Sequence, residues 1–172
     1  MVLCNSTKFF TICSKEFLSC NCFSTVGASG RESVGRYGVS LDEKPLFLPS
    51  FHCIGAVIYI KQSLGRLSAL CGCVVAATGS SCGITYLMGG GYSEVTYAVK
   101  NMIANLAGMI CDGAKPSCAM KCASGVSTAV VSALMAMNNR YVKSVEGIID
   151  DDVDKSIRNL TDIGRDAMVH TD

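Results

Sequence analysis

Apolar residues recur at helical spacing through the middle of the chain, and this pattern predicts an all-α fold. From Ile54 onward the apolar positions fit a mostly buried helix that breaks near Thr78-Gly79. The stretch Gly83–Met88 predicts a short second helix that ends before three consecutive glycines. Strand signals are weak along the whole chain, since no β-branched run is long enough. We therefore expect a helical bundle.

Capping residues predict where the later helices begin and end. Ser93 is a suitable N-cap with Glu94 in the first turn, and Gly113 is a suitable C-terminal residue for that helix. Pro116 predicts the start of the next helix, which is expected to continue through Met137. A final helix is expected from the acidic run 150–152 to residue 164. At least four helices are thus predicted between residues 51 and 165.

The first 50 residues differ from the rest of the chain because they show no apolar periodicity. We expect residues 1–50 to be a divergent, irregular and poorly ordered segment. Residues 51–172 are expected to form part of a helical domain. Residues 1–50 offer no apolar face to pack on the helices that follow, which suggests a fragment of a longer helical protein.

The composition excludes some classes of protein. Hydrophobic residues make up 49% of the 172 residues and charged residues 17%, which argues against a wholly disordered chain. A net charge of +1 gives no support for a nucleic-acid partner. Glycines interrupt the uncharged stretch 67–93, and serine, threonine and alanine dilute the stretch 122–139, so both are expected to be buried helices of a soluble bundle. No membrane partner is therefore expected.

Eleven cysteines are an odd number, so they cannot all pair in intrachain disulfides. A chain with this much apolar core does not need disulfides, which favours a reducing cytoplasm. Packing as a small apolar side chain is the default role of each cysteine. The segment between Cys111 and Cys118 is the exception, because it places two thiols at a turn between two helices. By itself this spacing is weak evidence for metal, since zinc sites favour shorter spacings.

Four stretches resemble the L-cysteine desulfidase family, which is related to the alpha subunit of bacterial iron–sulfur L-serine dehydratase. The longest is IANLAGMICDGAKPSCAMK at 103–121. The others are GRLSALCGC at 65–73, GITYLMGG at 83–90 and EGIIDDDVD at 146–154. They occur in the family's order, and the resemblance covers about residues 51–172, at the C-terminal side of the family's larger helical catalytic domain.

The resemblance implies a [4Fe–4S] cluster held by three cysteines, with one iron left open to substrate. Carried over by motif, the cofactor-binding and metal-ligating residues are Cys71, Cys111 and Cys118. Three other cysteines, Cys73, Cys82 and Cys122, fall outside the family positions and are expected to pack. Helical geometry would also point Cys73 about 200° away from Cys71.

The resemblance further implies a lyase that eliminates sulfide from L-cysteine, or water from L-serine, to give pyruvate and ammonia. The open iron would act as a Lewis acid on the leaving group. The expected partners are a small amino-acid substrate and, in a homo-oligomer, further copies of the chain. No residue is assigned as the catalytic base, because the surroundings of Cys20 and Cys22 do not match the family.

Two alternative interpretations remain open at the level of sequence. One is a non-catalytic helical metal-binding or scaffold fragment, and the other is a membrane-embedded helical fragment. Neither His52 nor His170 has a partner in sequence that would indicate catalysis. The acidic run 150–152 is interpreted as a helix N-terminus stabilised by negative charge.

Overall fold

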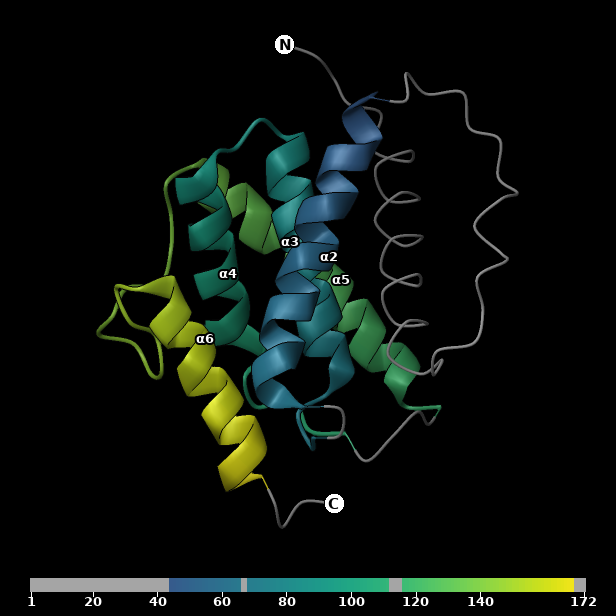
Figure 1. Ribbon diagram of the computed structural model, residues 1–172, viewed down its shortest axis with the longest axis vertical. Helices are drawn as coiled ribbons and strands as arrows, with labels where there is room; N and C mark the ends of the chain where they lie inside the picture. Colours follow the sequence, from purple (N-terminus) through teal and green to yellow (C-terminus); the bar gives the residue numbers. More distant parts are fainter. Residues whose placement is uncertain (1–43, 66–67, 112–115, 169–172) are drawn as a thin grey trace.

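The computed structural model describes residues 44–65, 68–111 and 116–168, with side chains from residue 52 onward. Helices α2 (Lys44–Leu64) and α3 (Gly72–Leu87) cross at the centre of the view in Figure 1. Helices α4 (Tyr92–Leu106) and α5 (Cys118–Met137) pack on α3, and α6 (Val153–Asp162) covers one side, extended by a π-helical turn, η1 (Ile163–Ala167). No strand is present among these residues, and the predicted all-α bundle is confirmed.

Helix α3 forms the centre of the bundle, in contact with α2, α4 and α5. All of its residues from Cys73 to Thr85 are buried, although several carry hydroxyl groups. These hydroxyls donate to carbonyls one turn earlier, as Thr78 does to Val74 (2.8 Å) and Thr85 does to Ser81 (2.8 Å). A hydroxyl satisfied within its own helix costs little to bury, so a polar sequence can occupy the core.

The predicted helix break near Thr78-Gly79 is wrong. The break comes earlier, between the end of α2 at Leu64 and the start of α3 at Gly72, and Gly65 after α2 has a φ of +86°, a conformation that glycine adopts readily. Gly79 instead allows α2 to approach α3, because a Cβ there would lie 2.6 Å from the carbonyl oxygen of Cys53. The predicted short helix at 83–88 is the C-terminal part of α3, which ends at Leu87.

The predicted boundary at residue 50 falls inside α2, since residues 44–50 are already helical. The rest of the segment expected to be irregular lies outside the described residues. Helix α2 is apolar and has no strongly polar face, so the spacing of its apolar residues did not predict that it begins at Lys44. The irregular segment expected at 1–50 therefore cannot include its last seven residues.

The N-cap of α4 lies two residues before the predicted one. Its N-cap is Gly91 rather than Ser93, and the Glu94 carboxylate accepts a 2.7 Å hydrogen bond from the Gly91 N–H. Gly89, with a φ of +89°, makes the turn from α3. The helix ends at Leu106, before Gly113, which lies outside the described residues.

Helix α5 runs to Met137 as predicted, and Asn138 is its C-cap. It was expected to be buried, but only one face is; the buried residues are Gly125, Val126, Ala129, Ser132, Ala133 and Ala136. Val131 and Leu134 are about half exposed on the other face. Within the described residues α5 is the one helix long and apolar enough to cross a membrane, as judged by length and composition. The absence of a membrane partner thus remains a prediction.

Two buried polar residues of α4 hold the connection from α5 to α6. Asn101 accepts a hydrogen bond from the Val142 N–H (2.9 Å) and donates to the Arg140 carbonyl (3.2 Å). Lys100 donates to the Asp151 carbonyl at 2.7 Å. The connection leads to Asp152, which caps α6 by accepting from the Asp154 N–H. The predicted acidic helix N-terminus is confirmed.

Candidate metal centre

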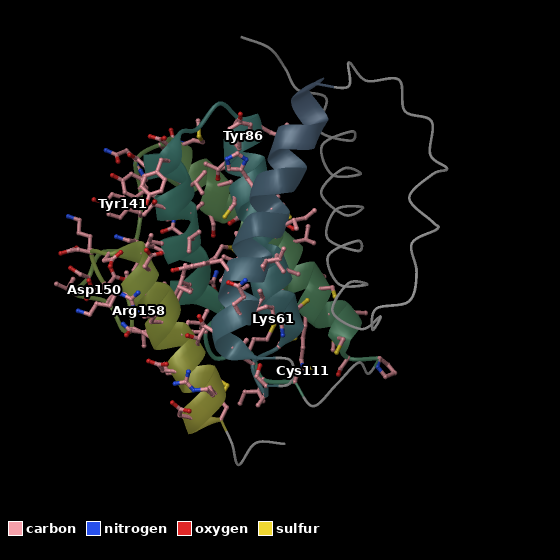
Figure 2. All side chains as sticks on the ribbon, in the orientation of Figure 1. Lys61, Tyr86, Cys111, Tyr141, Asp150 and Arg158 are labelled. Atoms are coloured by element: carbon pink, nitrogen blue, oxygen red, sulfur yellow. The ribbon has the colours of Figure 1, made fainter. Side chains whose placement is uncertain are left out.

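A short antiparallel backbone bridge brings two of the predicted ligands together. Leu70 pairs with Ile110. The N–H of Cys71 donates to the Met109 carbonyl (2.9 Å) and that of Cys111 to the Ala69 carbonyl (2.8 Å). The bridge joins the loop before α3 to the loop after α4, so the two cysteines lie side by side at one end of the bundle. Cys111 and Lys61 mark this end in Figure 2.

Cys118 reaches the same place from the first turn of α5. Its Sγ lies 3.4 Å from the Sγ of Cys111. Lys121, one turn further along α5, donates a 2.7 Å hydrogen bond to the Ile110 carbonyl and so fixes the start of this helix against the bridge. The three predicted ligands thus come from three separate segments that meet at the bridge.

The thiol of Cys71 is strongly perturbed by its surroundings. It is the N-cap of α3, with a φ of −58° and a ψ of 127°. Hydrogen bonds from the thiol and the backbone N–H of Cys73 and from the thiol of Cys111, together with the nearby charge of Lys121, lower the pKa of Cys71 to about 6, against the opposing effect of burial. A thiolate is the form that binds metal, so the surroundings of Cys71 favour ligation.

Lys61, in the last turn of α2, also approaches this group of thiols. Burial lowers the pKa of Lys61, and the charge of Cys71 acts in the opposite direction. Two cations, Lys61 and Lys121, therefore stand near Cys71 and favour its thiolate form. The sequence pattern did not assign either lysine to the site. Lys121 falls within the 103–121 stretch that resembles the family. Lys61 lies outside all four such stretches, on a separate helix, so nothing in the sequence linked it to the thiols.

The prediction that Cys73 points away from Cys71 is wrong. Cys71 caps the helix with an extended ψ, so the rotation expected of two residues within one helix does not apply. The Cys73 thiol lies within hydrogen-bonding reach of Cys71 and of the Sγ of Cys122, which is 3.3 Å away, and its single proton can be donated to either. Five thiols are thus linked at this end; they are Cys71, Cys73, Cys111, Cys118 and Cys122.

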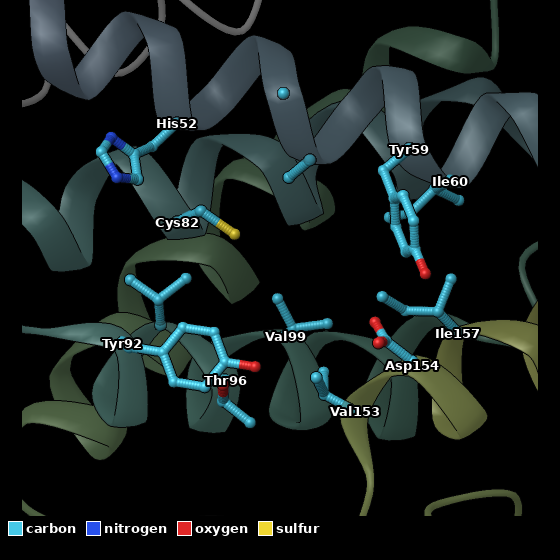
Figure 3. A pocket seen from close by; sticks show the side chains of 13 residues that line it. His52, Tyr59, Ile60, Cys82, Tyr92, Thr96, Val99, Val153, Asp154 and Ile157 are labelled. Carbon is cyan, nitrogen blue, oxygen red and sulfur yellow. The ribbon is translucent and has the colours of Figure 1, made fainter.

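Cys82 is not part of this group, as predicted. It lies in the middle of α3 and is fully buried, which raises the pKa of its thiol to about 12. It lines a pocket of about 250 Å³ between α2, α4 and the start of α6 (Figure 3). Tyr59 and Asp154 supply polar atoms at one end of the pocket, where burial and the Asp154 carboxylate raise the pKa of Tyr59. The other lining residues are mostly apolar.

The donors gathered at this end of the bundle are thiols, the ligand type of iron–sulfur clusters. Across the described ranges, no three His, Cys, Asp or Glu side chains are arranged to hold one metal ion. Ligands of a cluster each bind a different iron, so they do not need to converge on one point. All the donors that meet here are thiols, as such clusters prefer. The choice of Cys71, Cys111 and Cys118 among the five remains a prediction.

The family relationship is independent of this geometry. The model of the serine dehydratase alpha chain family matches residues 38–172. A UPF0597 protein from Bacteroides thetaiotaomicron is 78% identical over 116 residues, and one from Porphyromonas gingivalis is 70% identical over the same length. A more distant UPF0597 protein, from Photobacterium profundum, is 49% identical over 115 residues.

These matches cover 67% of the chain but 27% of each relative, so the chain spans about a quarter of the length of the curated relatives it matches. No solved structure matches the chain. The family match begins at residue 38, ahead of α2 and of the expected boundary at residue 51. Because this match includes every described helix and all five linked thiols, the chain belongs to the serine dehydratase alpha chain family.

Proposed function

We propose that the chain carries the cluster-binding part of an iron–sulfur-dependent lyase of the L-cysteine desulfidase type. Such an enzyme would eliminate sulfide from L-cysteine, or water from L-serine, and release pyruvate and ammonia. The proposal combines the membership of the family with the thiol chemistry at the end of the bundle. Activity, substrate and partners are proposed for the whole family domain, of which this chain spans a part.

One observation carries the proposal: the Leu70–Ile110 bridge aligns Cys71 with Cys111, and Cys118 contacts Cys111 at 3.4 Å. These are the positions that the family motif assigns to the three ligands of a [4Fe–4S] cluster. When bound, the cluster would supply an open iron that acts as a Lewis acid on the leaving group of the substrate.

Residues of this chain would bind the proposed cluster and balance its charge. Cys71 would bind as a thiolate, since its hydrogen-bond donors already favour that form. Lys121 keeps the start of α5, and with it Cys118, against the bridge. Lys61 adds a second positive charge beside Cys71. None of the described residues is assigned here as the base that removes the α-proton.

The remaining expectations belong to the same proposal. We propose a small amino-acid substrate, a cytoplasmic location, a homo-oligomer, and no membrane or nucleic-acid partner. The exposed apolar face of α5 bears on the membrane question. Sedimentation of the purified chain with and without phospholipid vesicles would test it. Retention of the chain on the vesicles would contradict this part of the proposal.

Anaerobic reconstitution with iron and sulfide tests the cluster. The chain should bind about four iron and four sulfide and turn brown, as expected for a [4Fe–4S] centre. The variant Cys71→Ser should lose most of this iron, whereas the control Cys82→Ser should keep it, because Cys82 lies in the bundle core. Equal iron in the two variants would overturn the proposal. Zinc bound in place of a cluster would favour the metal-binding scaffold instead.

A further inference from the structure

Two cysteines at the same end of the bundle have no part in the proposed cluster. Cys73, in the first turn of α3, is 4% exposed, and Cys122, on the second turn of α5, is partly exposed. Their Sγ atoms lie 3.3 Å apart although the residues belong to different helices. We propose that Cys73 and Cys122 are a redox-active pair. A low-molecular-weight disulfide such as oxidised glutathione would oxidise the two thiols to a Cys73–Cys122 disulfide.

The separation of the two sulfurs favours this bond. A disulfide has an S–S length of about 2.0 Å. The two sulfurs must therefore close a gap of little more than an ångström, which rotation of the Cys122 side chain in the first turns of α5 can supply. The bond would tie α3 to α5, two helices that already pack against each other. No large movement of the backbone is needed.

The exposure of the two residues sets the order of the reaction. The more accessible thiolate, that of Cys122, attacks one sulfur of the oxidised reagent, forming a mixed disulfide and releasing one small thiol. The sulfur of Cys73 then attacks the Sγ of Cys122 and displaces the second small thiol. Two protein thiols are oxidised, one small disulfide is reduced to two thiols, and the proton of Cys73 leaves with the departing thiol.

A second thiol pair, Cys111 and Cys118, is also in contact, at 3.4 Å. These residues are the proposed cluster ligands, so bound iron would occupy them. Cys73 and Cys122 would then be the oxidisable pair next to the cluster. The choice between these two equally close pairs rests on the proposed function, because bound iron is what would keep Cys111 and Cys118 from pairing.

Tryptic peptide mapping distinguishes the two possible disulfides, because each would give peptides of a different mass. Trypsin cuts after Arg66, Lys100, Lys121 and Arg140, but not between Lys115 and Pro116. A bond between Cys73 and Cys122 would cross-link peptide 67–100 to peptide 122–140. A bond between Cys111 and Cys118 would stay within peptide 101–121. Fragmentation of the cross-linked peptide distinguishes Cys73 from Cys71 and Cys82.

The experiment treats the reduced full chain with oxidised glutathione, blocks the remaining thiols and maps the digest. We expect the 67–100 to 122–140 cross-link through Cys73 as the main disulfide in the iron-loaded chain, and its reversal by dithiothreitol. Cys122→Ser, a substitution at a partly exposed site, should abolish it, and the matched control Cys82→Ser should leave it unchanged. A cross-link through Cys71, a bond confined to 101–121, or no disulfide would each overturn the inference. Iron content, measured separately, reports on the proposed function.

Discussion

The ammonium group of Lys121 donates a 2.7 Å hydrogen bond to the main-chain carbonyl of Ile110. This contact joins the second turn of α5 to the bridge that aligns Cys71 and Cys111. A side chain on one helix thereby fixes the loop that follows another. The lysine has a structural effect on the bundle and an electrostatic effect on Cys71.

Lys121→Met is expected to lower the free energy of unfolding by about 1 kcal/mol, because it removes a charged donor from a carbonyl. Urea denaturation of the metal-free chain measures this change. Lys143→Met, in the exposed connection after α5, is the matched control and should change stability little. Equal losses in the two variants would show that the contact with Ile110 contributes nothing.

Cys118→Ser should abolish iron uptake during anaerobic reconstitution, and Cys122→Ser should leave it intact. A hydroxyl at position 118 is a poor iron ligand, whereas Cys122 is assigned to the redox-active pair. Iron content per chain, with circular dichroism to show that both variants fold, makes the comparison. The assignment of the ligands is wrong if both variants bind the same amount.

Gly79→Ala is expected to destabilise the bundle by about 1–3 kcal/mol. The new methyl group would meet Val57 and the Cys53 carbonyl, at 2.5 Å and 2.6 Å, and would push α2 away from α3. Gly55→Ala provides the control, because no atom lies within 4 Å of the new methyl group. It should be neutral or stabilise α2 by up to about 1 kcal/mol. Thermal melts that change by the same amount would disprove the close approach.

Asn101→Ala should cost about 2 kcal/mol, since it leaves the Val142 N–H without its acceptor at a partly buried position. The connection at 138–152 should also become more sensitive to trypsin, which cuts after Arg140 and Lys143. Asn105→Ala, on the exposed side of α4, is the control. If digestion proceeds at the same rate in both variants, Asn101 does not hold the connection.

Stability should fall as the pH rises from about 9 towards 12, in part because of Cys82. Burial raises the pKa of this thiol to about 12 in the folded chain, so only the unfolded chain loses the proton in that range. Ionisation of this thiol in the unfolded chain then lowers the free energy of unfolding by on the order of 1 kcal/mol for each pH unit. Cys82→Ala should show a shallower decline in urea denaturation across the same range. Parallel profiles would contradict the raised pKa, since the other titrating groups are common to both proteins.

The parts of the fold that the sequence predicts well are those with a marked polar face. Helices α4 and α6 alternate buried and exposed positions at helical spacing, and the end of α5 is marked by Asn138. Helices α2 and α3 carry no such contrast, because α3 is buried almost all round. Their apolar positions therefore mark no single buried face, and the sequence wrongly predicts the break between α2 and α3 at a position inside α3.

The thiols of the site were identified through the resemblance to the family, while their neighbours depended on the structure. Cys73 joined the group because Cys71 is a cap rather than a helical residue, a difference in one ψ angle that sequence spacing does not show. Lys61 approaches through the crossing of α2 over α3, which is a matter of tertiary packing. Residue type indicated the chemistry, but backbone conformation decided the contacts.

The bridge between Leu70 and Ile110 also fixes the order in which the site can be assembled during synthesis. Cys71 leaves the ribosome long before Cys111, and the two can meet only after α3 and α4 have folded back on each other. Cys118 follows seven residues after Cys111 in the sequence. If the three thiols bind the proposed cluster, a nascent chain shorter than this point would hold no complete acceptor for it, and cluster delivery would be a late event in the maturation of the chain.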